Sequence, residues 1–273
     1  MSEIDPKAFR DFEHAGWEAL PKRYHDAFAA LTSQVIEPLL DTVGVKQGMR
    51  VLDVASGPGY VAGAAAKRGA NVTGLDFAAA MVADAKRRYP GVEFREGDAE
   101  SLPFKEASFD AVVMNFGLLH LGRPERALVE AHRVLRAGGK AGFTVWAKPE
   151  EARAFGIVLA AIEQHGNKNV ALPPGPPFFR FSEAGEFRRA LSDAGFTKAD
   201  VQAVPQLWRL RNPEELFEVM LGSTVRTGGL LRAQTSGAQQ AIRNAIVEAA
   251  SRYRKADAVE LPMPAVLASG GKS

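Results

Sequence analysis

Strand-like and helix-like segments alternate along residues 49–146, and this alternation restricts the fold more than any other feature of the sequence. Short apolar runs of strand length are separated by segments with helical spacing and by glycine or proline turns. The five expected strands lie at 49–54, 71–75, 92–95, 109–115 and 141–146. Because strands joined by helices through short connections lie parallel with right-handed crossovers, the pattern predicts a doubly wound α/β sheet with helices on both faces.

The segments on either side of this alternation are expected to be mainly helical. Residues 17–43 carry apolar side chains at spacings of three and four, which is typical of an amphipathic helix. Beyond Pro149 the expected elements are helices at 150–164, 182–194 and about 213–254, and strands at 200–207 and 259–269. We therefore divide the chain into an N-terminal helical cap at 1–46, an α/β core at 47–148, and a C-terminal part at 149–273 that completes the sheet and carries a helical lid at about 213–255.

Composition excludes several kinds of site. The absence of cysteine rules out disulfides, thiolate zinc sites and a cysteine nucleophile, and none of the five histidines joins a metal-ligand cluster in the sequence. A net charge of +2 offers no basic field for nucleic acid. The apolar stretches are too short to span a bilayer, and residues 1–7 lack the apolar core of a secretory signal. We therefore expect a cytoplasmic protein that binds small molecules and needs no metal.

A glycine-containing turn follows the first strand at 51–59, with the sequence VLDVASGPG. Ligands of open parallel sheets bind beyond the carboxyl ends of the strands, and Gly57 and Gly59 let the backbone approach them closely. Nicotinamide enzymes have similar turns, but Asp53 would repel their diphosphate. Beside a cation the same carboxylate gains about 4 kcal/mol at about 4 Å with an effective dielectric of about 20. Asp53 thus favours S-adenosylmethionine (SAM), whose sulfonium and α-amino groups are cationic; the alternative is a carboxylate that only caps the turn.

Polar residues also follow the later strands. Asp76, at the end of the second strand, is suited to the ribose hydroxyls of an adenosyl group, although it is equally suited to capping the helix near Ala78. Asp98 is expected to accept from an adenine amino group. His120 follows the fourth strand and is the candidate general base, with a histidine satisfied by the backbone as the alternative.

Together these motifs resemble those of a known family. The matching segments are 51–59, Gly74-Leu75-Asp76, Gly97-Asp98-Ala99, 109–112 and 135–139. Over residues 45–148 the chain is similar to class I SAM-dependent methyltransferases, within them to the ubiquinone/menaquinone-biosynthesis branch. The resemblance implies a seven-stranded Rossmann-like sheet whose last strand is antiparallel. It also implies that Ala99 lies at the adenine and Asn115 near the methionine end. Ala55 stands where the family has its first loop glycine.

The resemblance and the motif positions define the expected cofactor site. Its members are Asp53, Ala55, Gly57, Gly59, Asp76, Phe77, Met81, Asp98, Ala99, Glu100, Asn115, Phe116, Tyr24 and Thr32. Similar enzymes close their N-terminal segment over SAM, so that the Tyr24 or Trp17 ring would face the sulfonium; ordinary packing of these rings is the alternative.

The expected activity is methyl transfer from SAM to a small-molecule acceptor, by C- or O-methylation. Two other functions stay open. A protein of this fold can bind SAM without transferring a methyl group, as a pericyclic catalyst, a decarboxylase or a sensor. The second open function is that of a nicotinamide-dependent oxidoreductase, which Asp53 disfavours.

Overall fold

The expected parallel strands form part of a seven-stranded sheet in the computed structural model, which describes residues 4–273. The strand order is β3-β2-β1-β4-β5-β10-β6, and β10 runs antiparallel to both β5 and β6. The strands are β1 (Arg50–Val54), β2 (Asn71–Asp76), β3 (Glu93–Glu96), β4 (Phe109–Asn115), β5 (Leu135–Trp146), β6 (Thr197–Val204) and β10 (Ala265–Gly271). The predicted α/β class and the antiparallel last strand are both confirmed.

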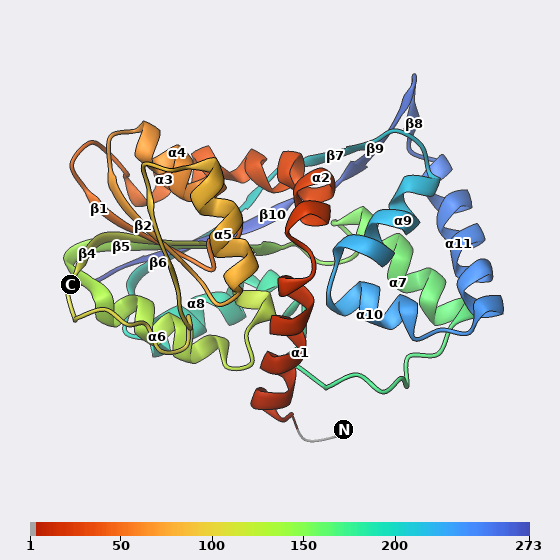
Figure 1. The fold of residues 1–273 in the computed structure, drawn as a ribbon, viewed down its shortest axis with the longest axis horizontal. Helices are drawn as coiled ribbons and strands as arrows, with labels where there is room; N and C mark the ends of the chain where they lie inside the picture. Colours follow the sequence, from red (N-terminus) through yellow and green to blue (C-terminus); the bar gives the residue numbers. More distant parts are fainter. Residues whose placement is uncertain (1–3) are drawn as a thin grey trace.

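Helices cover both faces of this sheet, as Figure 1 shows. One face packs against α3 (Ile36–Val43), α4 (Tyr60–Lys67) and α5 (Ala79–Arg88), and the other against α6 (Pro124–Val134) and α8 (Ala184–Asp193). Side chains alternate along β4, so that Ala111 and Val113 join the first core and Val112 and Met114 the second. This double burial explains why residues 111–114 of β4 are all apolar.

The N-terminal segment contradicts the prediction of one helix at 17–43. It forms α1 (Pro6–Glu18), α2 (Pro21–Thr32), a 3₁₀ turn (Ser33–Val35) and α3. Leu20 has non-helical angles, φ −111° and ψ 0°, because it precedes Pro21, which begins α2. Pro38 lacks the N–H that would continue the helix through the 3₁₀ turn. Residues 1–3 of the expected cap lie outside the described residues.

Prolines also divide two of the expected C-terminal strands. The strand expected at 200–207 becomes β6 and β7 (Leu207–Leu210), separated by Pro205. The strand expected at 259–269 becomes β9 (Ala258–Pro262) and β10, separated at Pro262 and Pro264. In each case one half stays in the large sheet, and the other joins β8 (Arg254–Lys255) in a three-stranded sheet of order β7-β9-β8. A residue without an N–H cannot continue a ladder, so the chain changes sheets there.

The segment expected as a helical lid forms three helices, which pack with a fourth into a lobe at the right of Figure 1. They are α7 (Arg153–His165), α9 (Glu214–Ser223), α10 (Arg226–Arg232) and α11 (Ser236–Ser251). Helix α1 crosses the space between this lobe and the sheet. No helix within residues 4–273 has the length and apolar character needed to cross a membrane.

Candidate functional site

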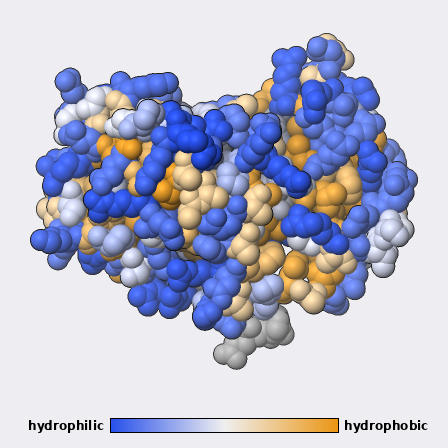
Figure 2. All heavy atoms as spheres, in the orientation of Figure 1, coloured by the Kyte–Doolittle hydropathy of each residue, from blue (hydrophilic) through white to orange (hydrophobic). Residues whose placement is uncertain are grey.

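A cavity lies beyond the carboxyl ends of β1, β2 and β4, with α1 and the lobe as further walls. Its empty space measures about 1340 Å³, including the part open to solvent. Figure 2 shows apolar side chains gathered beside α1, over the lobe. The expected site residues that line the cavity are Tyr24, Thr32, Asp53, Ala55, Gly57, Asp76, Phe77, Met81, Asp98, Ala99, Glu100, Asn115, Phe116 and His120.

Gly59 is the one expected site residue that does not line the cavity. It is the residue before α4 and has φ +84°, a conformation that favours glycine. A Cβ atom there would lie 2.7 Å from Cζ of Phe94. Gly59 therefore serves the turn and its packing, and the structure does not bring it to the ligand space.

Asp53 is the next-to-last residue of β1, with 1% of its surface exposed. Its Oδ2 accepts a hydrogen bond of 2.9 Å from the Ala62 N–H, so the turn-capping alternative is part of its role. Its Oδ1 is buried and has no partner within residues 4–273. Burial raises the pKa of the Asp53 carboxyl to about 8, against the lowering effect of the Ala62 N–H. A cation at Oδ1 would satisfy the free oxygen and favour the ionised form.

Asp76, the last residue of β2, forms a hydrogen bond with the glycine turn that follows β1. Its Oδ2 accepts from the Gly57 N–H at 2.8 Å and its Oδ1 from the Ala78 N–H at 3.0 Å. Burial raises the pKa of Asp76 to about 6, and these two N–H groups oppose that shift. An ionised carboxylate has about four acceptor positions, so Asp76 caps the segment before α5 and still keeps capacity for a ligand.

The backbone at Ala55 adopts φ +53° within the same turn. This left-handed conformation costs an L-residue roughly 1–2 kcal/mol. Gly117 lies so close that a Cβ atom on it would come within 2.8 Å of the Ala55 Cβ. The substitution of the family's glycine by alanine thus keeps the turn at the cost of local strain.

The loop after β3 carries the residues expected at the adenine. Asp98 accepts from the Glu100 N–H at 2.9 Å and pairs with Arg10 of α1 at 3.1 Å. The Ala99 N–H has no hydrogen-bond partner within residues 4–273 and lies in the cavity wall. The Glu100 carboxylate accepts from the backbone N–H and Nε of Arg123, both at 2.8 Å. Glu100 therefore binds Arg123 through its side chain, and Ala99 has the free donor.

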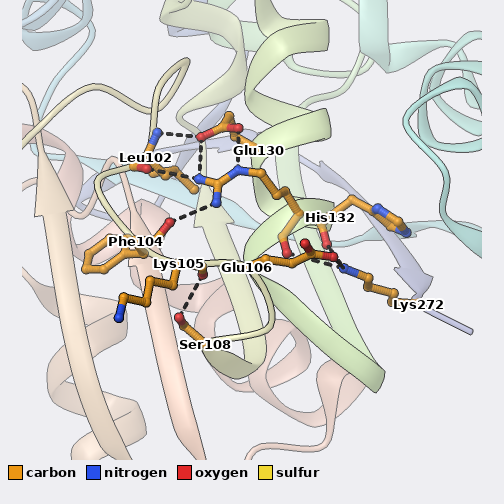
Figure 3. A network of polar contacts seen from close by, with 9 residues as sticks. Leu102, Phe104, Lys105, Glu106, Ser108, Glu130, His132 and Lys272 are labelled. Atoms are coloured by element: carbon orange, nitrogen blue, oxygen red, sulfur yellow. Dashed lines mark hydrogen bonds and ion pairs between the residues drawn. The ribbon is translucent and has the colours of Figure 1, made fainter.

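A polar network anchors the far end of this loop, as Figure 3 shows. Arg133 of α6 donates to the carbonyls of Phe104 at 2.8 Å and Leu102 at 3.0 Å. Glu130 accepts from Arg133 Nε and from the Leu102 N–H, both at 2.7 Å. Lys272 donates to the carbonyls of His132 and Arg133 at 3.0 and 3.2 Å. These bonds fix the 97–108 segment and with it the position of Asp98.

Asn115 closes the cavity wall at the end of β4. Its Oδ1 accepts from Thr144 Oγ1 at 2.6 Å, and its Nδ2 donates to the Thr32 carbonyl at 3.2 Å. The next residue, Phe116, has φ +54° and donates its N–H to Thr144 at 3.0–3.1 Å. The sheet end is thereby tied to α2 through side chains.

Aromatic residues of α1 and α2 form another wall. The rings of Trp17 and Tyr24 meet edge to face at 5.5 Å, and Tyr24 stacks on Phe28 at 5.7 Å. The Tyr24 hydroxyl lies 3.5 Å from Thr32 Oγ1. Trp17 and Tyr24 both border the cavity while packing on each other, so contact with a cation remains a prediction.

His120 is bound to a residue that the sequence did not single out. Its Nδ1 lies 3.0 Å from Oε2 of Glu13, which also accepts from Trp17 Nε1 at 3.0 Å. The Glu13 side chain is fully buried, and its Oε1 has no partner within residues 4–273. The partner of the ring is thus a carboxylate and not the backbone, which contradicts the alternative considered for this histidine. With Nδ1–H turned to Glu13, Nε2 is left as the basic nitrogen.

Sequence reasoning missed Glu13 and Arg226, which both belong to this half of the cavity. Phe9, Glu13 and Trp17 recur every four residues on α1, so an acid on an apolar helical stripe was a usable signal. Arg226 lies in a segment interpreted only as a mobile cover. Among residues 4–273 no three side chains of His, Asp or Glu are grouped to hold a metal ion.

Comparison with known proteins agrees with this geometry. Residues 52–143 match the family described as a methyltransferase domain. The chain is 46% identical over 102 residues to a demethylmenaquinone methyltransferase of Renibacterium salmoninarum, over 37% of this chain and 43% of that protein. It is 35% identical over 161 residues to a demethylmenaquinone methyltransferase of Chlorobaculum parvum, over 55% of this chain and 67% of that protein. It thus spans less than half the length of the first relative and two thirds of the second.

A solved structure shares the fold over nearly the whole chain. Phosphoethanolamine N-methyltransferase 2 of Haemonchus contortus matches with a TM-score of 0.59 at 19% identity, over 98% of this chain and 61% of that chain. With the motifs in order and the last strand antiparallel, the chain belongs to the class I SAM-dependent methyltransferases of the ubiquinone/menaquinone type.

Proposed function

We propose that this chain transfers a methyl group from SAM to a small-molecule acceptor, at carbon or oxygen. The observation that carries the proposal is Oδ1 of Asp53, a buried acceptor that borders the cavity near the end of β1 and has no partner among residues 4–273. A buried oxygen of this kind is unfavourable unless a ligand supplies a donor. The α-ammonium group of SAM is such a donor, and a diphosphate is not.

The remaining wall fits the other parts of SAM. Asp76 keeps acceptor capacity for two ribose hydroxyls, and the Ala99 N–H is a free donor for an adenine nitrogen. The aromatic pair of Trp17 and Tyr24 offers π-faces to a sulfonium. The Haemonchus structure of the same fold holds S-adenosylhomocysteine, the demethylated product of SAM.

The lobe side of the cavity offers a place for the acceptor. Bound SAM would supply a methyl group on a positively charged sulfur. As the acceptor atom bonds to the methyl carbon, the bond from that carbon to sulfur would break, and the sulfur would leave as a neutral thioether. The chain holds the two partners in line and keeps water out, which supplies much of the rate enhancement. Where the attacking atom carries a proton, His120 Nε2 takes it, and Glu13 stabilises the imidazolium that results.

The relatives suggest which acceptors to test first. Both are named for the methylation of a demethylmenaquinone. A quinol of that kind is a small, largely apolar aromatic molecule, and the walls of this cavity include Phe116, Trp146, Phe155 and Phe178.

Calorimetry followed by a transfer assay tests the proposal. SAM and S-adenosylhomocysteine should bind, and NADPH should not. Labelled SAM incubated with a panel of quinols and phenols should then yield a labelled acceptor. Binding of NADPH in preference to SAM would overturn the assignment. SAM binding with no transfer to any acceptor in the panel or in a cell extract would identify a SAM-binding protein of another function.

One variant pair tests the site itself. Asp76→Ala should weaken SAM binding at least about tenfold, since hydrogen bonds to an ionised group contribute roughly 1.5–3 kcal/mol. Asp110→Ala is the matched control, because Asp110 is also buried but pairs with Arg50 and Arg136 outside the cavity. Unchanged SAM affinity in Asp76→Ala would contradict the assignment of the motif.

A further inference from the structure

Arg226 stands where the cavity meets the lobe. It begins α10, and its guanidinium carbon lies 5.0 Å from the ring centre of Phe9 and 5.3 Å from that of Phe178. The residue lines the main cavity and also a smaller apolar cavity beneath residues 172–175. Stacked between two rings, the guanidinium is held in place by cation–π contacts.

The charge of Arg226 has no carboxylate partner. The other arginine that lines the cavity, Arg10, pairs with Asp98 at 3.1 Å. Within residues 4–273, by contrast, no carboxylate oxygen lies within 4.0 Å of the Arg226 guanidinium. Its one hydrogen bond there goes from Nη1 to the Pro176 carbonyl at 3.0 Å. Four of its five N–H groups therefore have no hydrogen-bond partner within residues 4–273.

Burial makes this unpaired cation costly. Desolvation lowers the pKa of Arg226, and the charge of Glu13 opposes the shift without forming an ion pair. Glu13 accepts from His120 and Trp17 through Oε2, and within residues 4–273 no hydrogen bond joins its Oε1 to Arg226. A half-buried guanidinium without a bonded anion loses hydration and gains little in return, whereas an anion entering the cavity would compensate it.

The guanidinium and the candidate base share one neighbour. The Phe178 ring centre is 6.0 Å from the His120 ring centre, and the same ring packs against Arg226. A flat molecule on Phe178 would therefore contact both groups. Phe155 and the stacked pair of Phe116 and Trp146, whose centres are 4.0 Å apart, add aromatic surface to the cavity. At the strand end, Asp53 and Asp76 would repel an anion.

We propose that Arg226 binds an anionic oxygen, carboxylate or phenolate, of an aromatic acceptor that lies against Phe178. The identity of this ligand as the methyl acceptor rests on the proposed function, but its binding to Arg226 does not. Arginine is suited to this task because its planar donors match an oxyanion and its faces stack on aromatic rings.

Two isosteric probes test the charge preference. The dissociation constants of 2-naphthoate and 2-naphthamide are measured by calorimetry, with and without S-adenosylhomocysteine. The wild-type protein should bind naphthoate at least about tenfold more tightly than naphthamide, as expected for a charge-assisted hydrogen bond. Failure of naphthoate to bind with a millimolar or better dissociation constant, or equal affinity for the two probes, would overturn the proposal without any variant.

Three variants assign the preference to the residue. Arg226→Met keeps the side-chain length and should remove the preference for naphthoate, while Arg226→Lys should retain part of it. Arg232→Met is the control, because Arg232 lies on the same helix but does not line the cavity. A preference that survives in Arg226→Met would contradict the proposal. So would an equal loss of S-adenosylhomocysteine affinity in that variant, which would place Arg226 in the cofactor site.

The outcomes separate this inference from the proposed function. If neither SAM nor S-adenosylhomocysteine binds, the proposed function fails while the probe measurement without cofactor still decides the role of Arg226. If SAM binds and the probes show no charge preference, the anion site alone is rejected.

Discussion

At the scale of single residues, the most consequential group is the carboxyl of Asp53, because its burial makes the charged form unfavourable. Asp53 is buried, one of its oxygens is free, and its pKa is raised to about 8. The unfolded chain releases this proton near pH 3.8, the ordinary value for aspartate, whereas the folded protein holds it until about pH 8. Between these values the folded protein binds more protons, so its stability falls as the pH rises.

The variant Asp53→Asn should separate stability from binding. The amide oxygen keeps the Ala62 N–H bond while the buried charge disappears. At pH 8.5 we expect the ligand-free variant to melt higher than the wild type, by roughly 2–4 °C for each kcal/mol gained, and at pH 5 we expect no difference. Thermal unfolding at the two pH values is the measurement, and an equal effect at both would show that the charge is not the cause.

SAM binding should respond to pH in the opposite direction. Because the cation favours ionised Asp53, the affinity of the wild type should rise between pH 6 and pH 8.5, whereas Asp53→Asn should lack this rise and bind at least about tenfold more weakly at pH 8.5. Titration calorimetry of both proteins measures the SAM affinity at each pH. The amino group of SAM titrates in both, so only the difference between them reports on Asp53. Parallel pH curves would contradict the role of Asp53.

Glu13 acts through His120 in the proposed mechanism, and this makes it a positioning residue. Glu13→Gln keeps the shape of the side chain but removes the charge that stabilises the imidazolium. We expect kcat to fall roughly 10–100-fold, less than the roughly 10²–10⁴-fold attributed to general acid–base catalysis itself because the imidazole remains, with the KM for SAM little changed. His120→Ala should lower kcat in the same way.

A double-variant cycle distinguishes this role from a structural one. If Glu13 works only through His120, adding Glu13→Gln to His120→Ala should cost no further activity. ¹⁵N NMR of the wild-type histidine should show the proton on Nδ1 of His120. Additive losses of activity in the double variant, or a proton on Nε2 instead of Nδ1, would contradict the mechanism.

At the scale of elements, the packing of the Tyr89 ring against α4 explains a third glycine near the turn. A Cβ atom on Gly63 would lie 2.2 Å from Cε1 of Tyr89, the residue that follows α5. The glycine is thus required by packing between helices. Its spacing from Gly57 and Gly59, which resembles that of a nicotinamide loop, carries no information about phosphate.

The effect of Gly63→Ala on the free energy of unfolding should accordingly change sign when Tyr89 is replaced by alanine. In the wild type the clash should destabilise the fold by roughly 1–3 kcal/mol, the usual effect of overpacking. In a Tyr89→Ala background the clash is absent, and Gly63→Ala should stabilise the fold by up to about 1 kcal/mol through helix propensity. Urea unfolding of the four proteins gives the cycle, and destabilisation in both backgrounds would refute the explanation.

Local periodicity predicted the bounds of an element where its apolar pattern has a single interpretation. The expected β4 at 109–115 has the observed bounds, because a mostly apolar run of seven residues between turns has no competing interpretation. The long helix expected at 17–43 and the long strand expected at 259–269 were wrong for the same reason. Each contains prolines whose missing N–H ends an element while the apolar pattern continues.

At the scale of the whole molecule, α1 joins the two halves of the cavity. Arg10 pairs with Asp98 at 3.1 Å near one end, and Glu18 accepts from the Ala80 N–H at 3.1 Å near the other. Between them Glu13 binds His120. A helix attached by a few polar links at a cavity rim gains stability when a ligand fills the space beneath it.

Hydrogen exchange should therefore show α1 responding to the cofactor. On addition of S-adenosylhomocysteine, amides of α1 should exchange more slowly, while those of α11, which packs on α7 away from the cavity, should not change. Exchange followed by mass spectrometry resolves the two segments, and the Asp76→Ala protein, at a ligand concentration that saturates only the wild type, provides the weak-binding control. Equal protection of α1 and α11, or none in α1, would contradict the role of α1 as the cover.

The sequence by itself determined the alternating strands and helices of the core and the acids at its carboxyl edge. Both follow from contiguous residues, since periodicity names the elements and each strand end brings its own side chain to the shared edge. Asp53, Asp76 and Asp98 could be placed for that reason. Only the tertiary structure decided the acceptor half. Glu13 and His120 lie 107 residues apart, and Arg226 meets Phe9 of α1 and Phe178 of a distant loop. No local pattern encodes such contacts, because they form only when α1 and the lobe pack across the cavity and exclude water from it.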